Sequence, residues 1–190
     1  MTVTVFDLTE WAADDDSADP TERRLQRRRR AFWHATARAG VGEVVWSCPT
    51  CGDSGHGRPT VAGASLSTSS HGDWAVMVID RSDALVGIDI TPVRAPAEAD
   101  AIAAGFFTPI EAQQRPTGGW TEGPAFARLW SAKESLGKAR GTGIAVPSPQ
   151  EPGGSLDTAT SAVTVRDLAG LCTLPPHLEG SLVTLPGQGL

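Results

Sequence analysis

The stretch WAVMVIDRSDALVGIDI, residues 74–90, decides how this chain folds. It contains two apolar runs, residues 74–79 and 85–90, with a polar turn over residues 80–83 between them. Short runs rich in valine and isoleucine predict two β-strands joined by a tight connection. Side chains alternate along a strand, so the valine and isoleucines of the second run share one face and Asp89 lies on the other. The stretch therefore puts one carboxylate on the strand face opposite the main aliphatic set.

Outward from this pair, the chain alternates strand and helix signals. Residues 2–6 read as a strand, and a helix begins near Pro20 and runs without a breaker to Gly40. Further helices are expected over residues 97–104 and 124–139, a long loop over 47–64, and a pair of strands over 161–185. The order predicts an α+β fold of two halves, residues 1–83 and 84–190, each with strands and a helix.

Composition narrows the classes of function. The chain has 190 residues, 40% of them hydrophobic and 20% charged. A chain of this length and composition can bury a hydrophobic core without disulfides or structural metals. The net charge of -6 argues against a general nucleic-acid binder. A local exception is an arginine run over residues 23–30, which directly follows an acidic segment.

Location follows from what the sequence lacks. No apolar stretch approaches the roughly 20 residues that cross a bilayer, and the start lacks a signal-peptide layout. The three cysteines, Cys48, Cys51 and Cys172, are unevenly spaced and predict no disulfide framework. We therefore expect a cytoplasmic protein that does not bind a membrane.

The densest group of polar residues lies on one predicted helix, LWSAKESLGK over residues 129–138. Glu134 and Lys138 are four residues apart and share a face of that helix. Taken alone, this spacing is most often a surface ion pair of little energy. Here a glycine-rich turn, residues 141–143, follows at once, and its backbone can approach an anionic ligand closely.

Together, two motifs resemble the surfactin-synthetase-activating class of 4'-phosphopantetheinyl transferases. That class has a Gly-hydrophobic-Asp strand, matched by Gly87-Ile88-Asp89, and later a Trp-x-x-Lys-Glu-x-x-x-Lys helix. The helix motif is matched here by Trp130, Lys133, Glu134 and Lys138. Between them, FFTPIE over residues 106–111 is similar to the class's Phe-Phe-Ser-x-x-Glu segment.

The resemblance extends upstream. His56-Gly57-Arg58-Pro59 is similar to a loop ahead of the coenzyme A site, and residues 65–69 match a nucleotide-binding turn. Residues 33–38 are a looser match to a segment whose arginine contacts a coenzyme A phosphate. The resemblance thus implies a set of coenzyme A contacts: Arg38, Arg58, Ser67, Thr68, His71, Lys133 and Lys138.

The resemblance also implies a reaction. Phosphopantetheine would pass from coenzyme A to a serine of an apo acyl or peptidyl carrier protein, with Mg²⁺ held by Asp89 and Glu134. Glu134 would also help to deprotonate the serine, while Lys133 and Lys138 neutralise phosphate charge. Asp89, Glu134 and Lys138 are the expected catalytic residues. The class further implies a fold of two pseudo-symmetric halves, each a small sheet on a long helix, in a monomer.

Two positions depart from the class. Many relatives carry a second acid two residues after the aspartate, and this chain has Thr91 there. Many also carry a histidine where this chain has Thr68, and His71 either substitutes for it or is an ordinary loop residue. A non-catalytic coenzyme A or nucleotide-binding protein is therefore the second hypothesis.

Three other features of the sequence allow more than one interpretation. Cys48, Cys51 and His56 suggest zinc, but no second pair of ligands has suitable spacing, so we expect no zinc module and no nucleic-acid binding. The arginine run could instead steer coenzyme A or an acidic carrier protein by its charge. The apolar residues Phe106, Phe107, Ile110 and Trp120 either pack in the core or form a docking surface, and Phe106 is expected in the core.

Overall fold

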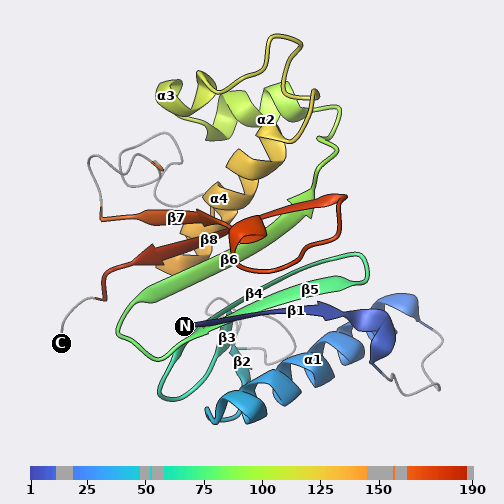
Figure 1. Cartoon of the computed structure of the whole chain (residues 1–190), viewed down its shortest axis with the longest axis vertical. Coiled ribbons are helices and arrows are strands. Elements are labelled where there is room, and N and C mark those ends of the chain that lie inside the picture. The colour runs from blue at the N-terminus through green and yellow to red at the C-terminus, as the bar shows by residue number, and fades with distance from the viewer. Residues whose placement is uncertain (12–18, 48–51, 53–57, 145–155, 157–161, 188–190) are drawn as a thin grey trace.

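The computed structural model describes residues 1–11, 19–47, 52, 58–144, 156 and 162–187. Its centre is formed by two antiparallel sheets of three strands each, with strand orders β1-β5-β4 and β6-β8-β7. One long helix covers each sheet on its outer side (Figure 1). The layers are therefore helix, sheet, sheet and helix, which confirms the α+β class.

The first sheet is formed by β1 (Thr2–Asp7), β4 (Ser65–His71) and β5 (Trp74–Asp80). Its outer face packs against α1 (Pro20–Ala39) through a cluster that includes Phe6, Phe32 and Met77. A short 3-10 helix, η1 (Leu8–Glu10), follows β1. The predicted strands at 2–6 and 74–79 are confirmed, each extended by one residue.

Both ends of α1 agree with the signals in its sequence. The Asp19 side chain accepts a hydrogen bond from the Thr21 amide at 2.9 Å, which caps the first turn. Pro20 occupies the first turn, where it removes no helical hydrogen bond. Gly40 ends the helix with a φ of 61°, a left-handed conformation that favours glycine.

The second sheet is formed by β6 (Leu85–Pro92), β7 (Thr164–Asp167) and β8 (Leu178–Leu185). Its outer face packs against α4 (Ala125–Arg140), which is the predicted motif helix. Two shorter helices, α2 (Ala99–Phe106) and α3 (Pro109–Ala112), lie beyond β6, and a 3-10 helix, η3 (Leu168–Gly170), follows β7. The expected helices and C-terminal strands are thus present, with ends shifted by a few residues.

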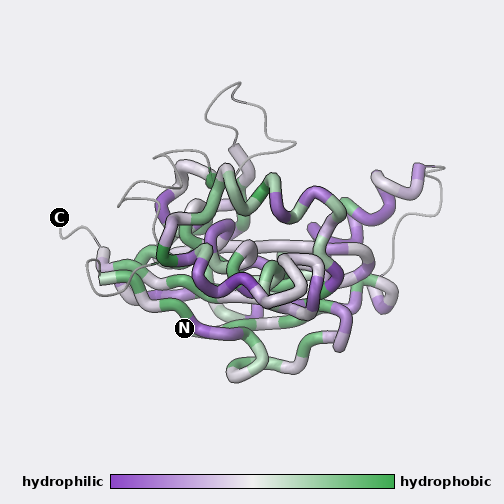
Figure 2. Tube along the Cα trace, turned by 90° about the horizontal axis from the view of Figure 1, so that it is seen from above, coloured by the Kyte–Doolittle hydropathy of each residue, from purple (hydrophilic) through white to green (hydrophobic). Residues whose placement is uncertain are grey.

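The two sheets share one core. Val76 and Val78 of β5 pack with Val86 and Ile88 of β6 and with Leu182 of β8. Residues 75–79 of β5 are hydrophobic without interruption because both faces of this strand are buried. Elsewhere along the trace, hydrophobic and hydrophilic positions are interspersed (Figure 2). The turn at residues 81–84 connects β5 to β6, so the predicted boundary falls between the sheets. The division into halves of residues 1–83 and 84–190 and their pseudo-symmetry stay predictions.

Two expectations about the middle of the chain need correction. Residues 47–64, expected as one long loop, include β3 (Arg58–Thr60), which pairs antiparallel with β2 (Val45–Ser47). Residues 65–69, expected as a turn, instead lie in β4, because Gly72 supplies the turn beyond them. Polar serines in place of β-formers hide this strand from sequence reasoning.

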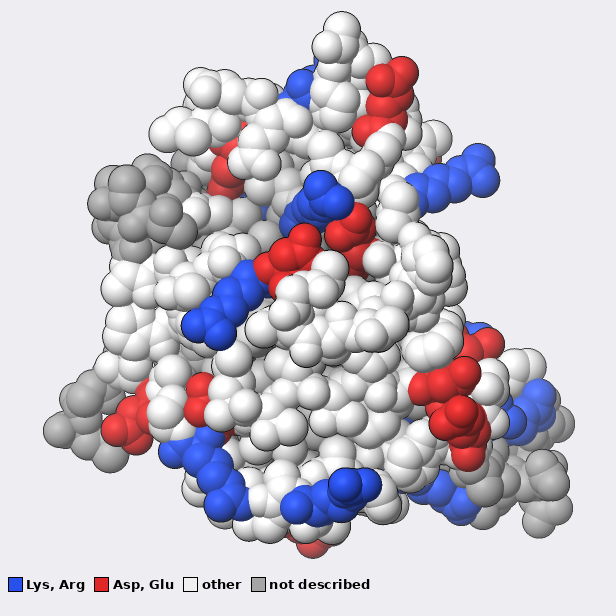
Figure 3. All heavy atoms as spheres, viewed as in Figure 1, with Lys and Arg blue, Asp and Glu red and all other residues white. Residues whose placement is uncertain are grey.

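Charge and hydropathy add two observations. Basic and acidic side chains lie in small mixed groups on the face seen in Figure 3, with no broad patch of one sign there. Within the described ranges, every helix is too short or too polar to qualify as a membrane span.

Candidate functional site

The candidate site lies at the seam between the two sheets. β4 and β6 are edge strands of different sheets, and serine side chains bridge them. Ser67 Oγ accepts a hydrogen bond from the Ile88 amide at 3.1 Å. Ser69 Oγ donates to Asp89 Oδ1 at 2.7 Å. Alternate residues of β4 therefore reach across the seam, and one of them holds the predicted carboxylate.

Asp89 is also held from the opposite side by α4. Lys138 Nζ donates to Asp89 Oδ1 at 2.6 Å and to the Ile88 carbonyl oxygen at 3.2 Å. Only 6% of Asp89 is exposed, so this is a largely buried ion pair rather than the surface Glu134–Lys138 pair that spacing alone suggests. The carboxylate is thus fixed by one residue from each half of the chain.

Gly87 explains how α4 comes so close to β6. A Cβ atom at Gly87 would lie 1.8 Å from the Ser135 carbonyl oxygen and 2.6 Å from the Ala139 amide nitrogen. Only a residue without a side chain fits there. The glycine of the Gly-Ile-Asp motif therefore lets the helix sit against the strand that carries Asp89.

Glu134 lies one helical turn before Lys138 and is half-buried. Burial raises the pKa of Glu134, the negative charge of Asp89 raises it further, and Lys138 acts in the opposite direction. Glu134 shares a face of α4 with Lys138, which binds Asp89, so the two predicted carboxylates lie on the same side of the helix. Glu134 is therefore a group whose protonation state the site controls.

The donor chemistry of this pair fits a hard divalent cation. Mg²⁺ binds carboxylate oxygens, keeps several of its waters and bridges phosphates, so two carboxylates suffice for it. In the part of the chain that the structure describes, no group of three or more His, Cys, Asp or Glu side chains is placed to hold a metal. The set is thus unlike a closed zinc site.

Thr91, where relatives carry a second acid, has an acidic neighbour across the sheet. Thr91 pairs directly with Glu179 of β8, which sequence reasoning did not identify. Glu179 Oε1 lies 3.2 Å from Arg128 of α4, and that ion pair occupies it. The described carboxylates of the site are therefore Asp89 and Glu134.

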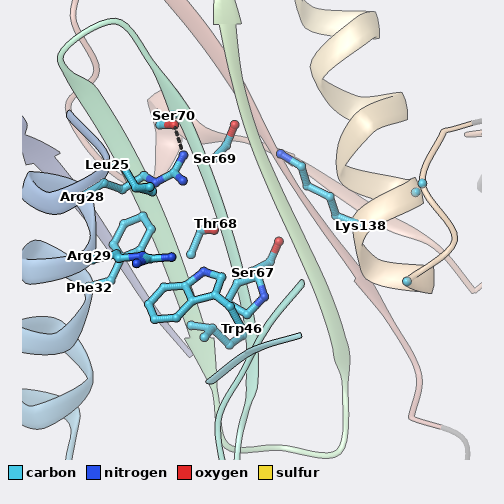
Figure 4. Close-up of a pocket in the computed structure, with 15 residues that line it drawn as sticks. Leu25, Arg28, Arg29, Phe32, Trp46, Ser67, Thr68, Ser69, Ser70 and Lys138 are labelled. Carbon is cyan, nitrogen blue, oxygen red and sulfur yellow. Dashed lines mark hydrogen bonds between the residues drawn. The ribbon is translucent and has the colours of Figure 1, made fainter. Parts of the chain in front are cut away.

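A cavity of about 430 Å³ opens beside this seam. On one side, Arg28 and Arg29 extend from α1, and on the other, Lys138 extends from α4 (Figure 4). Residues 66–70 of β4 line the space between them, and Arg28 donates to Ser70 Oγ at 3.0 Å. The cavity thus spans both halves and has cationic groups on opposite walls.

The basic wall has an aromatic neighbour. The Arg29 guanidinium lies over the Trp46 ring, 5.4 Å from its centre, as a cation–π contact. Burial lowers the pKa of Arg28, and the nearby charge of Arg29 lowers it further. Two cations held together in a partly buried space are stabilised by an anion, so this wall suits a phosphate.

The predicted coenzyme A contacts are only partly brought together. Ser67, Thr68 and Lys138 line the cavity. Arg38 and His71 are exposed and are not among its lining residues. Arg38 lies ten positions beyond Arg28, which is about 15 Å along a helix. The geometry therefore does not support Arg38 and His71, and their roles stay predictions.

Several other predictions cannot be placed. The side chain of Arg58 and the residues Cys48, Cys51 and His56 lie outside the described part of the chain. Cys172 is described and half-buried, and burial raises the pKa of its thiol.

Lys133, expected beside the pyrophosphate, is not among the residues that line the cavity, and that role stays a prediction. Its side chain is 1% exposed, and its ammonium lies 2.9 Å from Glu111 Oε2. Burial lowers the pKa of Lys133, and the hydrogen bond and charge of Glu111 act in the opposite direction. The lysine next to Glu134 therefore points into the protein.

Sequence reasoning missed Arg28, Arg29 and Trp46. The arginine run is visible in the sequence, but helical position alone does not say which of its members face the sheet. Trp46 lies in β2, directly before the segment expected as a loop. The arginines that face the cavity can be identified only when β4, the strand they lie against, is already recognised as a strand.

The apolar residues with two possible roles divide between core and surface. Phe107 and Trp120 are buried in one cluster with Phe126. Phe106 is half-buried against Trp130, with ring centres 5.4 Å apart, so its expected core position is largely confirmed. Ile110 of α3 is exposed, at 61%.

Comparison with known proteins addresses the second half of the chain. The family model described as the 4'-phosphopantetheinyl transferase superfamily (ACPS) matches residues 85–169. No curated protein matches the chain. The matched range begins with β6 and includes all of α4, so it contains Asp89, Glu134 and Lys138. The half of the chain that carries both carboxylates is thus similar to the 4'-phosphopantetheinyl transferase superfamily, and this match supports that family for the protein.

Proposed function

We propose that this protein transfers the 4'-phosphopantetheine group of coenzyme A to a serine of an apo acyl or peptidyl carrier protein. The observation that carries the proposal is the meeting of Asp89, Glu134 and Lys138 beside a cavity with a basic opposite wall. Coenzyme A carries a pyrophosphate and a 3'-phosphate, so it needs cationic groups at more than one point. Arg28 and Arg29 on one wall and Lys138 on the other meet that need.

The proposed chemistry is one phosphoryl transfer. The serine oxygen forms a bond to the phosphorus that carries pantetheine, and the bond from that phosphorus to the nucleotide phosphate breaks. Glu134, whose pKa is raised, accepts the serine proton, and the electron pair leaves with the nucleotide. Lys138 stabilises the charge that develops on the leaving phosphate. Mg²⁺, which Asp89 and Glu134 would hold, supplies neutralisation of the pyrophosphate when bound.

The finer assignment is to the surfactin-synthetase-activating class, as a cytoplasmic monomer. Its support is that one chain supplies both walls of the cavity: α1 and β4 from residues 1–83, and α4 from residues 84–190. A site completed within one chain does not need a second copy. Size-exclusion chromatography with light scattering tests this, and an obligate dimer would contradict it.

A non-catalytic coenzyme A-binding protein is the alternative, and Thr91 favours it. The neutral side chain leaves two described carboxylates for metal, and the cross-strand acid Glu179 is engaged by Arg128. Such a protein would bind coenzyme A but leave carrier proteins unmodified.

Mass spectrometry of carrier proteins separates the two functions. The protein is mixed with coenzyme A, Mg²⁺ and several apo carrier proteins, and one added phosphopantetheine group per carrier is expected. Asp89→Asn and Glu134→Gln should abolish the addition. Asp100→Asn, which alters an exposed acid paired with Arg115, is the matched control and should retain it. Intact coenzyme A binding without any modification would instead establish the binding protein.

A further inference from the structure

Glu111 and Lys133 form the most deeply buried ion pair among the described residues. The two side chains are 5% and 1% exposed, and Lys133 Nζ lies 2.9 Å from Glu111 Oε2. Buried charges are kept only where partners satisfy them, and loss of one partner is far more damaging than loss of an exposed pair. This pair has no place in the proposed chemistry, although Lys133 directly precedes Glu134.

The Glu111 carboxylate joins three separate segments. Oε2 also accepts a hydrogen bond from the Thr108 amide at 2.8 Å, which completes a capping box at the start of α3. Oε1 accepts from the Leu156 amide at 2.8 Å. One carboxylate thus binds an ammonium on α4 and main-chain amides at residues 108 and 156.

The two neighbours on α4 point in different directions. Consecutive residues on a helix are about 100° apart around its axis. Lys133 faces the α3 side, where Glu111 binds it, whereas Glu134 shares the face of α4 that carries Lys138, the partner of Asp89. Holding Lys133 therefore limits rotation of α4 about its axis, and such a rotation would turn Glu134 away from Asp89.

We propose that Glu111 and Lys133 are a positioning pair that sets the direction of Glu134, and that Lys133 is not a coenzyme A ligand. The inference rests on the proposed function, because it assigns Glu134 a role in transfer. It also gives the Phe-Phe-Thr-Pro-Ile-Glu segment a physical role, because Glu111 anchors the catalytic helix. Lys138 alone of the two motif lysines then faces the ligand.

The composition of the chain allows a direct test. Lys133 and Lys138 are its two lysines, so ¹⁵N-lysine labelling yields one side-chain ammonium signal from each. Lys138→Arg assigns the signals by removing one of them. Coenzyme A should shift the Lys138 signal and leave the Lys133 signal in place. A Lys133 shift as large as that of Lys138 would overturn the proposal. This arm needs no variant of the positioning pair.

Glu111→Gln supplies the second arm. It should move the Lys133 signal while the Lys138 signal stays, and it should lower kcat about tenfold or more with a coenzyme A Kd within about twofold of the unaltered protein. Lys138→Met is the comparison, because it should weaken coenzyme A binding about tenfold or more. Unchanged kcat in a folded Glu111→Gln protein would refute the positioning role.

The outcomes separate this inference from the proposed function. Breaking the buried pair should lower the thermal midpoint by about 10 °C, so kinetics are measured well below it. Glu111→Asp, which keeps the charge, should recover part of kcat, which a general loss of stability would not predict. If coenzyme A moves neither lysine signal, the proposed function fails, while the response of Lys133 to Glu111→Gln still reports on the pair.

Discussion

Asp89 is bound from both halves of the molecule. Ser69 of β4 and Lys138 of α4 both donate to its Oδ1 atom, at 2.7 Å and 2.6 Å. Glu134, half-buried beside it, has a pKa raised by burial and by the charge of Asp89. The site thus contains one carboxylate whose charge is compensated and one whose ionisation is opposed by its surroundings.

The raised pKa of Glu134 links protonation to stability. A carboxyl with a folded-state pKa above its unfolded value stabilises the fold fully below the unfolded pKa, and this contribution is lost as pH rises through the folded pKa. At neutral pH, without divalent cations, Glu134→Gln should therefore raise the thermal midpoint, by on the order of 2 °C. The gain should disappear as pH falls toward about 4. Calorimetry at a series of pH values measures this difference in thermal midpoint.

The control for this measurement is Glu43→Gln, which changes an exposed loop residue and should leave the midpoint nearly unaltered. A Glu134→Gln protein that is less stable at every pH would contradict the direction of the pKa shift. Mg²⁺ with coenzyme A should reverse the order of the two proteins, because ligands that bind Glu134 stabilise only the unaltered chain.

At the scale of secondary-structure elements, the packing of α4 on β6 depends on Gly87. Gly87→Ala places a methyl group 1.8 Å from main-chain oxygen, and backbone cannot yield as a flexible side chain does. We expect a loss of about 3 kcal/mol or more in the free energy of unfolding, together with loss of transfer. Urea denaturation measures the loss in the free energy of unfolding.

Gly105→Ala is the matched substitution. Gly105 lies in α2, and a Cβ there meets nothing within 4 Å, so alanine should be neutral or stabilise by up to about 1 kcal/mol. Equal effects of the two substitutions would show that Gly87 is not a close-approach position.

The direction of α1 decides which arginines reach the cavity. Arg28→Met should weaken coenzyme A binding by about 10- to 100-fold, because it removes a partly buried charged donor. Arg38→Met, on an exposed part of the same helix, should change it less than about twofold. Isothermal titration compares them, and a larger effect at Arg38 would restore the assignment made by resemblance.

Elements with strong local signals can be predicted from the sequence, whereas contacts between elements cannot. α1 is predictable because Asp19, Pro20 and Gly40 mark its ends, and the face of Asp89 follows from strand alternation. β4 escapes prediction because its polar face crosses the seam, so serines stand where a buried strand would carry aliphatic residues. The burial of Lys133 escapes prediction for a related reason: spacing on a helix does not reveal that a distant glutamate binds it.

The two sheets form a single folding unit at the scale of the whole molecule. Val76 and Val78 belong to the first sheet and pack with Val86, Ile88 and Leu182 of the second. The cavity also takes its walls from both halves. Neither half is therefore complete without the other, either in its core or in its candidate site.

A shared core predicts cooperative unfolding. Val78→Ala, at a position with no exposure, should lower the free energy of unfolding by about 2 kcal/mol. The opening free energy measured by amide hydrogen exchange in urea should fall by the same amount in α1 and in α4, because one transition opens both. Loss of protection confined to α1 would show that the halves unfold separately.

The Ser67 hydroxyl takes the place of a carbonyl opposite the Ile88 amide. A main-chain ladder breaks only when a strand moves, but a hydroxyl can release its partner by rotation about one bond. Deuterium uptake at the Ile88 amide would therefore report how often this contact between β4 and β6 opens. Slower uptake in the presence of a polyanionic ligand would show that the ligand holds the two strands together.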